Sequence, residues 1–441
     1  MAALRISVRI ACTVAWACLC IGCSPAKNVL SITPLAPAHE HTIEVAISPD
    51  GTRVATLHRN FSATPQASPK VQDSIDVQDA ASGHLLLSGA LPPWQPTPAY
   101  RVSGSAPLTY CDNGKYLVVA NGPNQLEVID AQTLQLHLHL VLSDLLAVTS
   151  SGSLAPYEKD LPFYNDVPFG CALTGPAAVL VFHGDVGLLA IRLFNLDTGT
   201  ITADWARSFT NRFQGDGIAF SPDGSRLAMV TWNFASRQGD QVEVIDTQSG
   251  KHLNTLPLND PSFVKHQLAF AGNGAVIIGE YPCQYYDVCG FRNANARHDR
   301  KLRIWNLAAN GTVRELGRPG AETYRSFGAS ADDSRIFSYT GAESYCSSCN
   351  NKAGEIKIDD ARFVVWDQSS GRVFARSAAL PIEIHKCPWL TFGACESWQQ
   401  VPQLQLSADG KAILAFWQQD FARPQSEQEK KFTNLEVYRL P

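Results

Sequence analysis

The chain has 441 residues, of which 45% are hydrophobic and 17% charged, so it can bury a large core and is not a disordered tail. Its 36 basic and 41 acidic side chains give a net charge of −5, without the basic excess that binding to a nucleic-acid backbone needs. No run reaches the roughly 18 consecutive apolar residues of a membrane-spanning helix.

The first 22 residues have the pattern of an export signal. Arg5 and Arg9 supply positive charge, and an uncharged run over residues 10–22 follows them. A positive segment before an apolar segment of this length is typical of a secretory signal peptide, which is removed from the mature protein. We therefore expect residues 1–22 to direct export and then to be cleaved.

The signal ends in the letters LCIGC, in which Gly22 precedes Cys23. This ending resembles the lipobox of bacterial lipoproteins, whose cysteine after a small residue carries the lipid and becomes the new N-terminus. The resemblance implies lipidation of Cys23, a tether over residues 23–27 and attachment to a membrane. Ser24 resembles the signal for the outer membrane, facing the periplasm, if the host has two membranes. The alternative is ordinary cleavage, for example after Ala26.

A short turn phrase recurs along the rest of the chain. Its copies are Ser48-Pro49-Asp50-Gly51, Cys111-Asp112-Asn113-Gly114, Ser221-Pro222-Asp223-Gly224, Ala271-Gly272-Asn273-Gly274, Ser330-Ala331-Asp332-Asp333 and Ser407-Ala408-Asp409-Gly410, with a degenerate copy at Leu173-Thr174-Gly175-Pro176. Proline fixes φ, Asp or Asn bonds its own backbone, and glycine accepts a positive φ. Each copy therefore predicts a tight turn between two strands.

A second phrase follows each turn, and it is an apolar strand that usually ends in Asp or Asn. Its copies are Val77-Gln78-Asp79, Val128-Ile129-Asp130, Leu193-Phe194-Asn195, Val244-Ile245-Asp246, Ile304-Trp305-Asn306, Val365-Trp366-Asp367 and Val437-Tyr438-Arg439. Because each phrase marks a strand end, the two phrases together predict four antiparallel strands in each repeating unit.

Repeating units of four antiparallel strands resemble the WD40-like β-propeller family over nearly all of the mature chain. Trp366-Asp367 reproduces the dipeptide that gives the family its name. The resemblance implies an all-β, seven-bladed β-propeller of four-stranded antiparallel blades, with residues 28–441 forming a single domain. An eight-bladed ring is the alternative.

The two ends of this domain predict how the ring closes. The last unit has no strand after its third one, whereas residues 28–35 have the pattern of a strand that belongs to no unit. Pairing of residues 28–35 with residues 433–439 would complete the last blade and cover an open sheet edge.

Cysteine usage agrees with export. After removal of the signal, and with Cys23 set aside for lipid, the remaining cysteines are Cys111, Cys171, Cys283, Cys289, Cys346, Cys349, Cys387 and Cys395. In an oxidising compartment their close spacings favour the pairs Cys283–Cys289, Cys346–Cys349 and Cys387–Cys395. Elimination then leaves Cys111–Cys171.

The insertions between strands predict one elaborated face. The connection between second and third strands is short in unit two, from Gly114 to Asp130, and much longer in units one, five and seven. The connections to the next unit are longest after units two and six. Because neighbouring strands run in opposite directions, both classes leave from one face and the tight turns occupy the other. Functional residues concentrate on loops held by a rigid scaffold, so the elaborated face is the candidate binding face.

Aromatic side chains in these insertions are the candidate contacts with a partner, because aromatic residues anchor protein interfaces. They are Trp94, Tyr100, Phe163, Tyr164, Tyr285, Tyr286, Tyr345, Trp389, Phe392 and Trp398. The alternative is that long loops need small hydrophobic cores of their own, in which these residues are buried.

The sequence carries no recognisable catalytic or metal motif. Cys346 and Cys349 have the spacing of a redox pair, but their surroundings indicate a loop and not the helix N-terminus that lowers a thiol pKa. His385 and Cys387 lack the paired motifs typical of zinc sites. Motifs for phosphate loops, haem attachment and a nucleophilic serine are missing as well. We expect neither a cofactor nor a metal.

Two classes of function follow. The favoured one is a monomeric, non-catalytic propeller of the cell envelope that binds a protein or peptide through its loops and meets the membrane only through its lipid. The alternative is a periplasmic enzyme or cofactor-binding subunit, similar to dehydrogenase or lactonase propellers, with a site at the mouth of the central channel. The fold does not decide between them. Carboxylates and histidines around a metal at the channel mouth would favour the enzyme.

Overall fold

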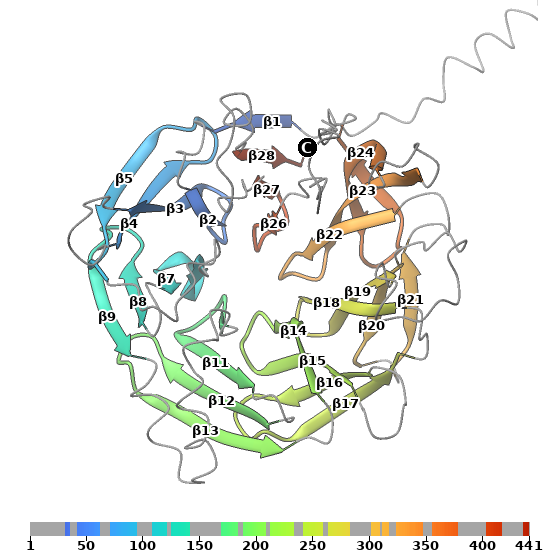
Figure 1. Cartoon of the computed structure of the whole chain (residues 1–441), viewed down its shortest axis with the longest axis horizontal. Coiled ribbons are helices and arrows are strands. Elements are labelled where there is room, and N and C mark those ends of the chain that lie inside the picture. Colours follow the sequence, from blue (N-terminus) through green and yellow to red (C-terminus); the bar gives the residue numbers. More distant parts are fainter. Residues whose placement is uncertain are drawn as a thin grey trace, which may run out of the picture.

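The computed structural model describes residues 31–35, 42–61, 71–94, 108–120, 125–141, 169–183, 188–208, 212–232, 241–258, 263–282, 301–308, 311–316, 323–346, 355–377, 403–416 and 435–440. They form seven four-stranded antiparallel sheets around a central axis (Figure 1). The expected all-β, seven-bladed propeller is confirmed, and the eight-bladed alternative is wrong. Within the described ranges no helix is long and apolar enough to cross a membrane.

The blades follow the chain in order, and each runs from an inner to an outer strand. Blade 1 comprises β2 (Thr42–Ile47), β3 (Arg53–Phe61), β4 (Val71–Asp79) and β5 (Leu85–Ala90). Blade 2 comprises β6 (Leu108–Cys111), β7 (Tyr116–Ala120), β8 (Gln125–Asp130) and β9 (Leu136–Val141), with a short 3-10 turn, η1 (Asp112–Gly114). Blade 3 comprises β10 (Phe169–Cys171), β11 (Ala177–His183), β12 (Leu188–Asn195) and β13 (Ile201–Ser208).

The second half of the ring has the same plan. Blade 4 comprises β14 (Arg212–Phe220), β15 (Arg226–Trp232), β16 (Gln241–Asp246) and β17 (His252–Pro257). Blade 5 comprises β18 (Phe263–Ala271), β19 (Ala275–Pro282), β20 (Lys301–Asn306) and β21 (Val313–Leu316). Blade 6 comprises β22 (Thr323–Ala329), β23 (Arg335–Cys346), β24 (Glu355–Asp367) and β25 (Val373–Arg376). Blade 7 comprises β26 (Gln403–Leu406), β27 (Ala412–Phe416), β28 (Leu435–Arg439) and β1 (Ser31–Pro34).

The N-terminal strand β1 closes the ring as expected. It pairs antiparallel with β28, with Ser31 opposite Arg439 and Pro34 opposite Glu436. Leu35 N then donates to Leu435 O at 3.1 Å. The edge of β28 that would otherwise be open is therefore covered by the other end of the domain (Figure 1).

The turn phrase forms the same hydrogen-bonded structure in several blades. In blade 1, Ser48 Oγ donates to Asp50 Oδ1 at 2.6 Å and accepts a bond from Arg53 N at 2.9 Å. Asp50 Oδ1 also accepts a bond from Thr52 N at 3.1 Å. The serine bonds repeat with the pairs Ser221–Asp223 and Ser407–Asp409. The local sequence thus fixes each turn before the blades pack.

Hydrogen bonds donated by backbone N–H groups link these turns from blade to blade on one face of the ring. In order, they join Asp112 N to Ala172 O, Leu173 N to Pro222 O, Asp223 N to the Asn273 side chain, Gly272 N to Ser330 O, Ala331 N to Ala408 O and Asp409 N to Pro49 O, at 2.7–3.3 Å. Between blades 1 and 2, Pro49 packs against Gly114 instead. This face is therefore a closed belt of tight turns.

The turn that contains Gly410 packs closely against the neighbouring blade. Its φ is +69°, and a Cβ there would lie 3.0 Å from Ser330 Cβ of the neighbouring blade. Gly199 has a φ of +70°, but a Cβ there would meet only Leu138 and Leu140 side chains at 3.6 Å or more. Gly410→Ala should lower the free energy of unfolding by about 1–3 kcal/mol. Gly199→Ala should lower it by less, and urea unfolding of both variants measures the difference. Equal losses would contradict the close inter-blade packing.

The hydrophobic core lies between neighbouring blades. One cluster joins Leu57 and Ile75 of blade 1 to Leu117 and Ile129 of blade 2, and all four side chains are buried. Toward solvent, the outer strand of one blade contacts the turn after the third strand of the next. Trp205 Nε1, for example, donates to Thr247 O at 2.8 Å.

Candidate functional site

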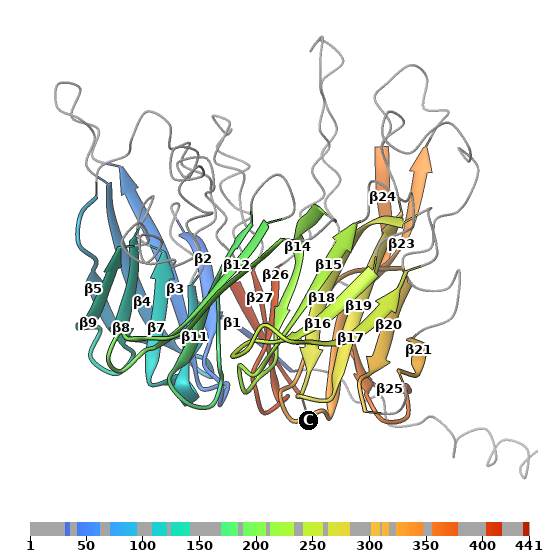
Figure 2. The ribbon, with the colours of Figure 1, turned by 90° about the horizontal axis from the view of Figure 1, so that it is seen from below.

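The ring has two unlike faces. We call the face that carries the turns at residues 48–52, 221–225 and 407–411 the turn face, and the opposite one the loop face. The turns after the third strands, such as residues 79–84, also lie on the turn face, because neighbouring strands in a blade are antiparallel. The second strands end, and the third strands begin, on the loop face (Figure 2).

Blade 6 extends farther toward the loop face than blade 5 beside it. Its strands β23 and β24 are the longest described, with 12 and 13 residues. They stay paired from Arg335 opposite Asp367 to Cys346 opposite Glu355. Figure 2 shows both strands extending beyond β19 and β20. The backbone of Tyr345, one of the candidate contacts, is part of this extension and pairs with Ile356.

Trp94 does not behave as an exposed contact. Its side chain is only 4% exposed, and Trp94 Nε1 donates to Asp73 Oδ2 at 3.3 Å. Arg59 Nε and Nη2 donate to the two oxygens of Asp73 at 3.0 and 2.9 Å, and the Arg59 guanidinium lies 5.2 Å from the Trp94 ring centroid. Trp94 therefore belongs to a buried cluster with Arg59 and Asp73, and the alternative of a small core under the loop applies to it.

The other candidate contacts, Tyr100, Phe163, Tyr164, Tyr285, Tyr286, Trp389, Phe392 and Trp398, lie outside the described residues. The same holds for Cys23, Cys283, Cys289, Cys349, Cys387 and Cys395. Cys346 is the last residue of β23. Lipidation and three of the proposed disulfides therefore stay predictions.

One position of the third strand carries a charge in most blades, and sequence reasoning missed it. It lies three residues before the strand-ending Asp, Asn or Arg and is occupied by Asp76, Glu127, Arg192, Glu243, Arg303 and Glu436. Each has a polar neighbour inside its own blade: Glu127 Oε1 lies 2.9 Å from His139 Nδ1, and Arg303 pairs with Glu280. The repeated letters QLEVID and QVEVID were the signal for this position. These charges are therefore structural.

Glu44 is the buried acid of an innermost strand. It lies in the middle of β2, all of whose residues are buried, and Val45 N donates to Glu44 Oε1 at 3.4 Å. Burial raises the pKa of the Glu44 carboxyl to about 8, although the bond from Val45 N opposes the shift. At neutral pH Glu44 is therefore mostly protonated. A neutral carboxyl of this kind is one that can give or take a proton near pH 7.

A polar cluster on the turn face joins blades 2 and 3. Asp197 Oδ1 accepts bonds from Lys115 Nζ at 2.6 Å and Tyr116 OH at 2.5 Å, and the His137 ring stacks on Tyr116 with centroids 5.0 Å apart. Lys115 and Tyr116 lower the pKa of Asp197, whereas burial and the bond to Asp197 raise that of Tyr116. The Tyr116 hydroxyl stays protonated and can donate to Asp197, so this bond links blade 2 to blade 3. In the described ranges no group of three or more His, Cys, Asp or Glu side chains is placed to bind a metal.

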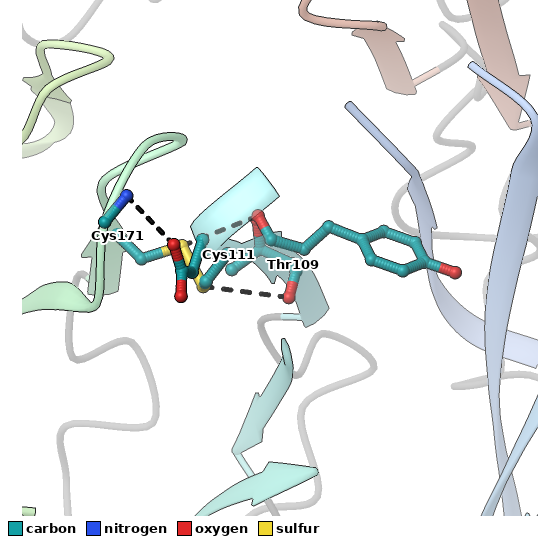
Figure 3. Close-up of a disulfide and its surroundings, with 6 residues drawn as sticks. Thr109, Cys111 and Cys171 are labelled. Atoms are coloured by element: carbon teal, nitrogen blue, oxygen red, sulfur yellow. Dashed lines mark hydrogen bonds between the residues drawn. A yellow bond between two sulfur atoms is a disulfide. The ribbon is translucent and has the colours of Figure 1, made fainter. Parts of the chain in front are cut away.

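The disulfide Cys111–Cys171 is confirmed. It joins the last residues of β6 and β10, the innermost strands of blades 2 and 3, with Cα atoms 5.6 Å apart (Figure 3). Cys111 is fully buried, and the Cys171 sulfur lies 3.5 Å from Tyr110 O. The pair that elimination left is therefore a bond between two blades and not within one loop.

Removing this disulfide should destabilise the ring. The bond closes a loop with a sequence separation of 60, so the unfolded chain without it gains conformational freedom. Cys111→Ser with Cys171→Ser should lower the free energy of unfolding by about 2–4 kcal/mol in urea. The matched control is the single variant of each cysteine, which should lose at least as much. An unchanged unfolding midpoint in the double variant would contradict this role.

No protein-family model matches the sequence, and no curated protein matches it. Solved structures do resemble the fold. A structure of hydrazine synthase from Kuenenia stuttgartiensis has a TM-score of 0.48 and 14% identity, covering 92% of this chain and 97% of that one. The β-propeller domain of Cps50 (Swd1) from Myceliophteria thermophila has a TM-score of 0.49 and 9% identity, covering 93% of this chain and 100% of that one. At such identities the likeness concerns the fold alone.

Proposed function

We propose that this chain is a non-catalytic propeller of the cell envelope, anchored by lipid on Cys23, that binds a protein or peptide through its loop face. The observation that carries the proposal is the difference between the two faces. The turn face is closed by inter-blade bonds such as Leu173 N to Pro222 O at 2.7 Å. The long insertions with their aromatic residues connect strand ends on the loop face, so that face offers the candidate anchors for a partner.

An experiment on the loop face tests the binding. Tyr286→Ala combined with Trp389→Ala should reduce recovery of crosslinked partners from intact envelopes by more than about tenfold, because aromatic anchors typically contribute more than about 2 kcal/mol each. Trp94 is left unchanged because it is buried. The control is Lys251→Ala with Lys411→Ala, which are exposed on the turn face and should leave recovery unchanged. Equal losses in the two double variants would contradict the choice of face.

Thermal stability separates binding from folding in this experiment. If the tyrosine and tryptophan substitutions lower the melting temperature strongly, these residues form a small core, as Trp94 does. Cys23→Ser tests the anchor separately: the variant should leave the membrane fraction, and equal partitioning with and without the thiol would refute lipidation.

The alternative, an enzyme with a site at the channel mouth, has one observation in its favour. Glu44 lies on an innermost strand with a pKa near 8, the range in which a carboxyl can transfer protons at neutral pH. Burial without any function accounts for the same shift.

A further inference from the structure

We propose that the outer rim of blades 6, 7 and 1, at its turn-face edge, rests on the phospholipid surface that holds the lipid of Cys23. This inference rests on the lipid anchor proposed above and adds a second, direct contact between the propeller and the bilayer. It also directs the loop face away from the membrane.

The first argument is the place where β1 begins. Strand β28 runs from the loop face to the turn face and ends at Arg439, and Ser31 lies opposite Arg439. The chain that connects Cys23 to the propeller therefore joins it on the outer strand of blade 7, at the turn-face edge. The eight steps from Cys23 to Ser31 span at most about 28 Å when fully extended. Such a short connection keeps this rim nearer to the bilayer than the loop face.

The second argument is the set of apolar side chains on the blades beside blade 7. Leu85 and Leu86 at the start of β5 are 58% and 47% exposed, and Val373 at the start of β25 is 37% exposed. All three follow a turn on the turn face, so they lie at the same edge as Ser31. Leu136, Leu253 and Val313 of blades 2, 4 and 5 are exposed at the equivalent edge, so the place where the tether joins the ring selects which of these apolar groups can reach the bilayer. Apolar groups at such an edge leave water when they enter the headgroup boundary of a bilayer, which lowers the free energy of the system.

A β-bulge explains why two consecutive leucines both point outward. The register between β4 and β5 shifts between Val77, which faces Leu87, and Gln78, which faces Leu85. Leu86 is the extra residue and is released from the strict alternation of a strand. Blade 4, on the opposite side of the ring, has the same bulge, with Leu253 at the equivalent position and 39% exposed.

The charges around the rim are compatible with a phospholipid surface. Arg372 and His84 are exposed next to Val373 and Leu85. The nearby carboxylate of Asp79 accepts bonds from Ser82 N and Ser82 Oγ at 2.8 and 2.7 Å, and that of Asp367 is paired with Arg335. The guanidinium of Arg372 is therefore the exposed group that can pair with a lipid phosphate, beside two carboxylates whose lowered pKa values keep them charged.

Photocrosslinking to lipid tests the rim contact. A benzophenone amino acid is placed at Leu86 or, as the matched control, at Leu253 in the full chain, and intact envelopes are illuminated. We expect phospholipid adducts, detected by mass spectrometry, to be several-fold more abundant at Leu86 than at Leu253. Because both positions are exposed strand residues, neither label should change the melting temperature.

The outcomes separate this inference from the anchor on which it rests. Equal adduct yields at both positions, or none at either, in a protein that leaves the membrane on Cys23→Ser substitution would overturn the rim contact and leave the anchor intact. A protein whose membrane partitioning does not depend on Cys23 would overturn the anchor and, with it, the rim contact. Adducts at Leu86 that vanish in the Cys23→Ser chain would support both.

Discussion

Replacing Asp73 by alanine should lower the free energy of unfolding by about 3–5 kcal/mol, because it leaves the charge of Arg59 buried without its partner. The two side chains are 1% and 0% exposed. Within the described part of the chain, Arg59 Nη1 has no hydrogen-bond partner even in the intact protein. The variant would therefore leave the guanidinium with almost no compensation. Urea unfolding of the purified chain measures the loss.

A double variant distinguishes the buried charge from simple loss of packing. Arg59→Met combined with Asp73→Leu removes both charges and keeps apolar volume, so it should be much closer in stability to the natural chain than Asp73→Ala. If Asp73→Ala costs less than about 1 kcal/mol, the pair is reached by water and the cluster around Trp94 is not a core.

Glu44 should make the stability of the propeller fall as the pH rises. The unfolded carboxyl titrates near its ordinary value of 4.5, whereas the pKa of the folded one is about 8. The folded protein therefore keeps a proton that the unfolded chain releases between these two values. The contribution of Glu44 is fully present below about pH 4.5 and is lost as the pH rises through 8.

Glu44→Gln should remove this dependence because an amide does not titrate. Between pH 5 and 8 the free energy of unfolding of the Glu44→Gln variant, relative to that of the natural chain, should rise by up to about 1.4 kcal/mol per pH unit. The measurement is urea unfolding at a series of pH values, and the control is Glu315→Gln, which changes an exposed glutamate of β21. Parallel profiles for Glu44→Gln and the natural chain would show that the carboxyl is hydrated in the folded state.

The blade plan could be predicted from the sequence because it depends on local chemistry. Ser48, Asp50 and Gly51 form a turn through bonds within a few residues, and the same letters return in other blades. The closing strand could be predicted because the last unit lacked an outer strand and residues 28–35 belonged to no unit. The pair Cys111–Cys171 followed once the nearer spacings were assigned to other cysteines.

The candidate site could not be predicted to the same extent because it depends on neighbours far along the chain. Trp94 lies in a loop-like stretch, and only the packing of β3 and β4 shows that Arg59 and Asp73 meet there and cover its ring. Contacts between blades could not be predicted from the local sequence either. Leu134 stands at a turn position with a φ of 57°, where other blades have glycine, and a Cβ on Gly89 of the preceding blade would lie 3.2 Å from Leu134 Cβ.

The closing pair β1–β28 also sets the order in which the ring can be completed. β1 is the first described strand, but its only sheet partner is the last one. A chain that emerges from its N-terminus must therefore hold β1 unpaired until every other blade has been delivered. Pairing across such a sequence distance is slow, because its loop-closure entropy is lost before the contact forms. Between the folding of β28 and its pairing with β1, the free edge of β28 can pair with strands of other chains.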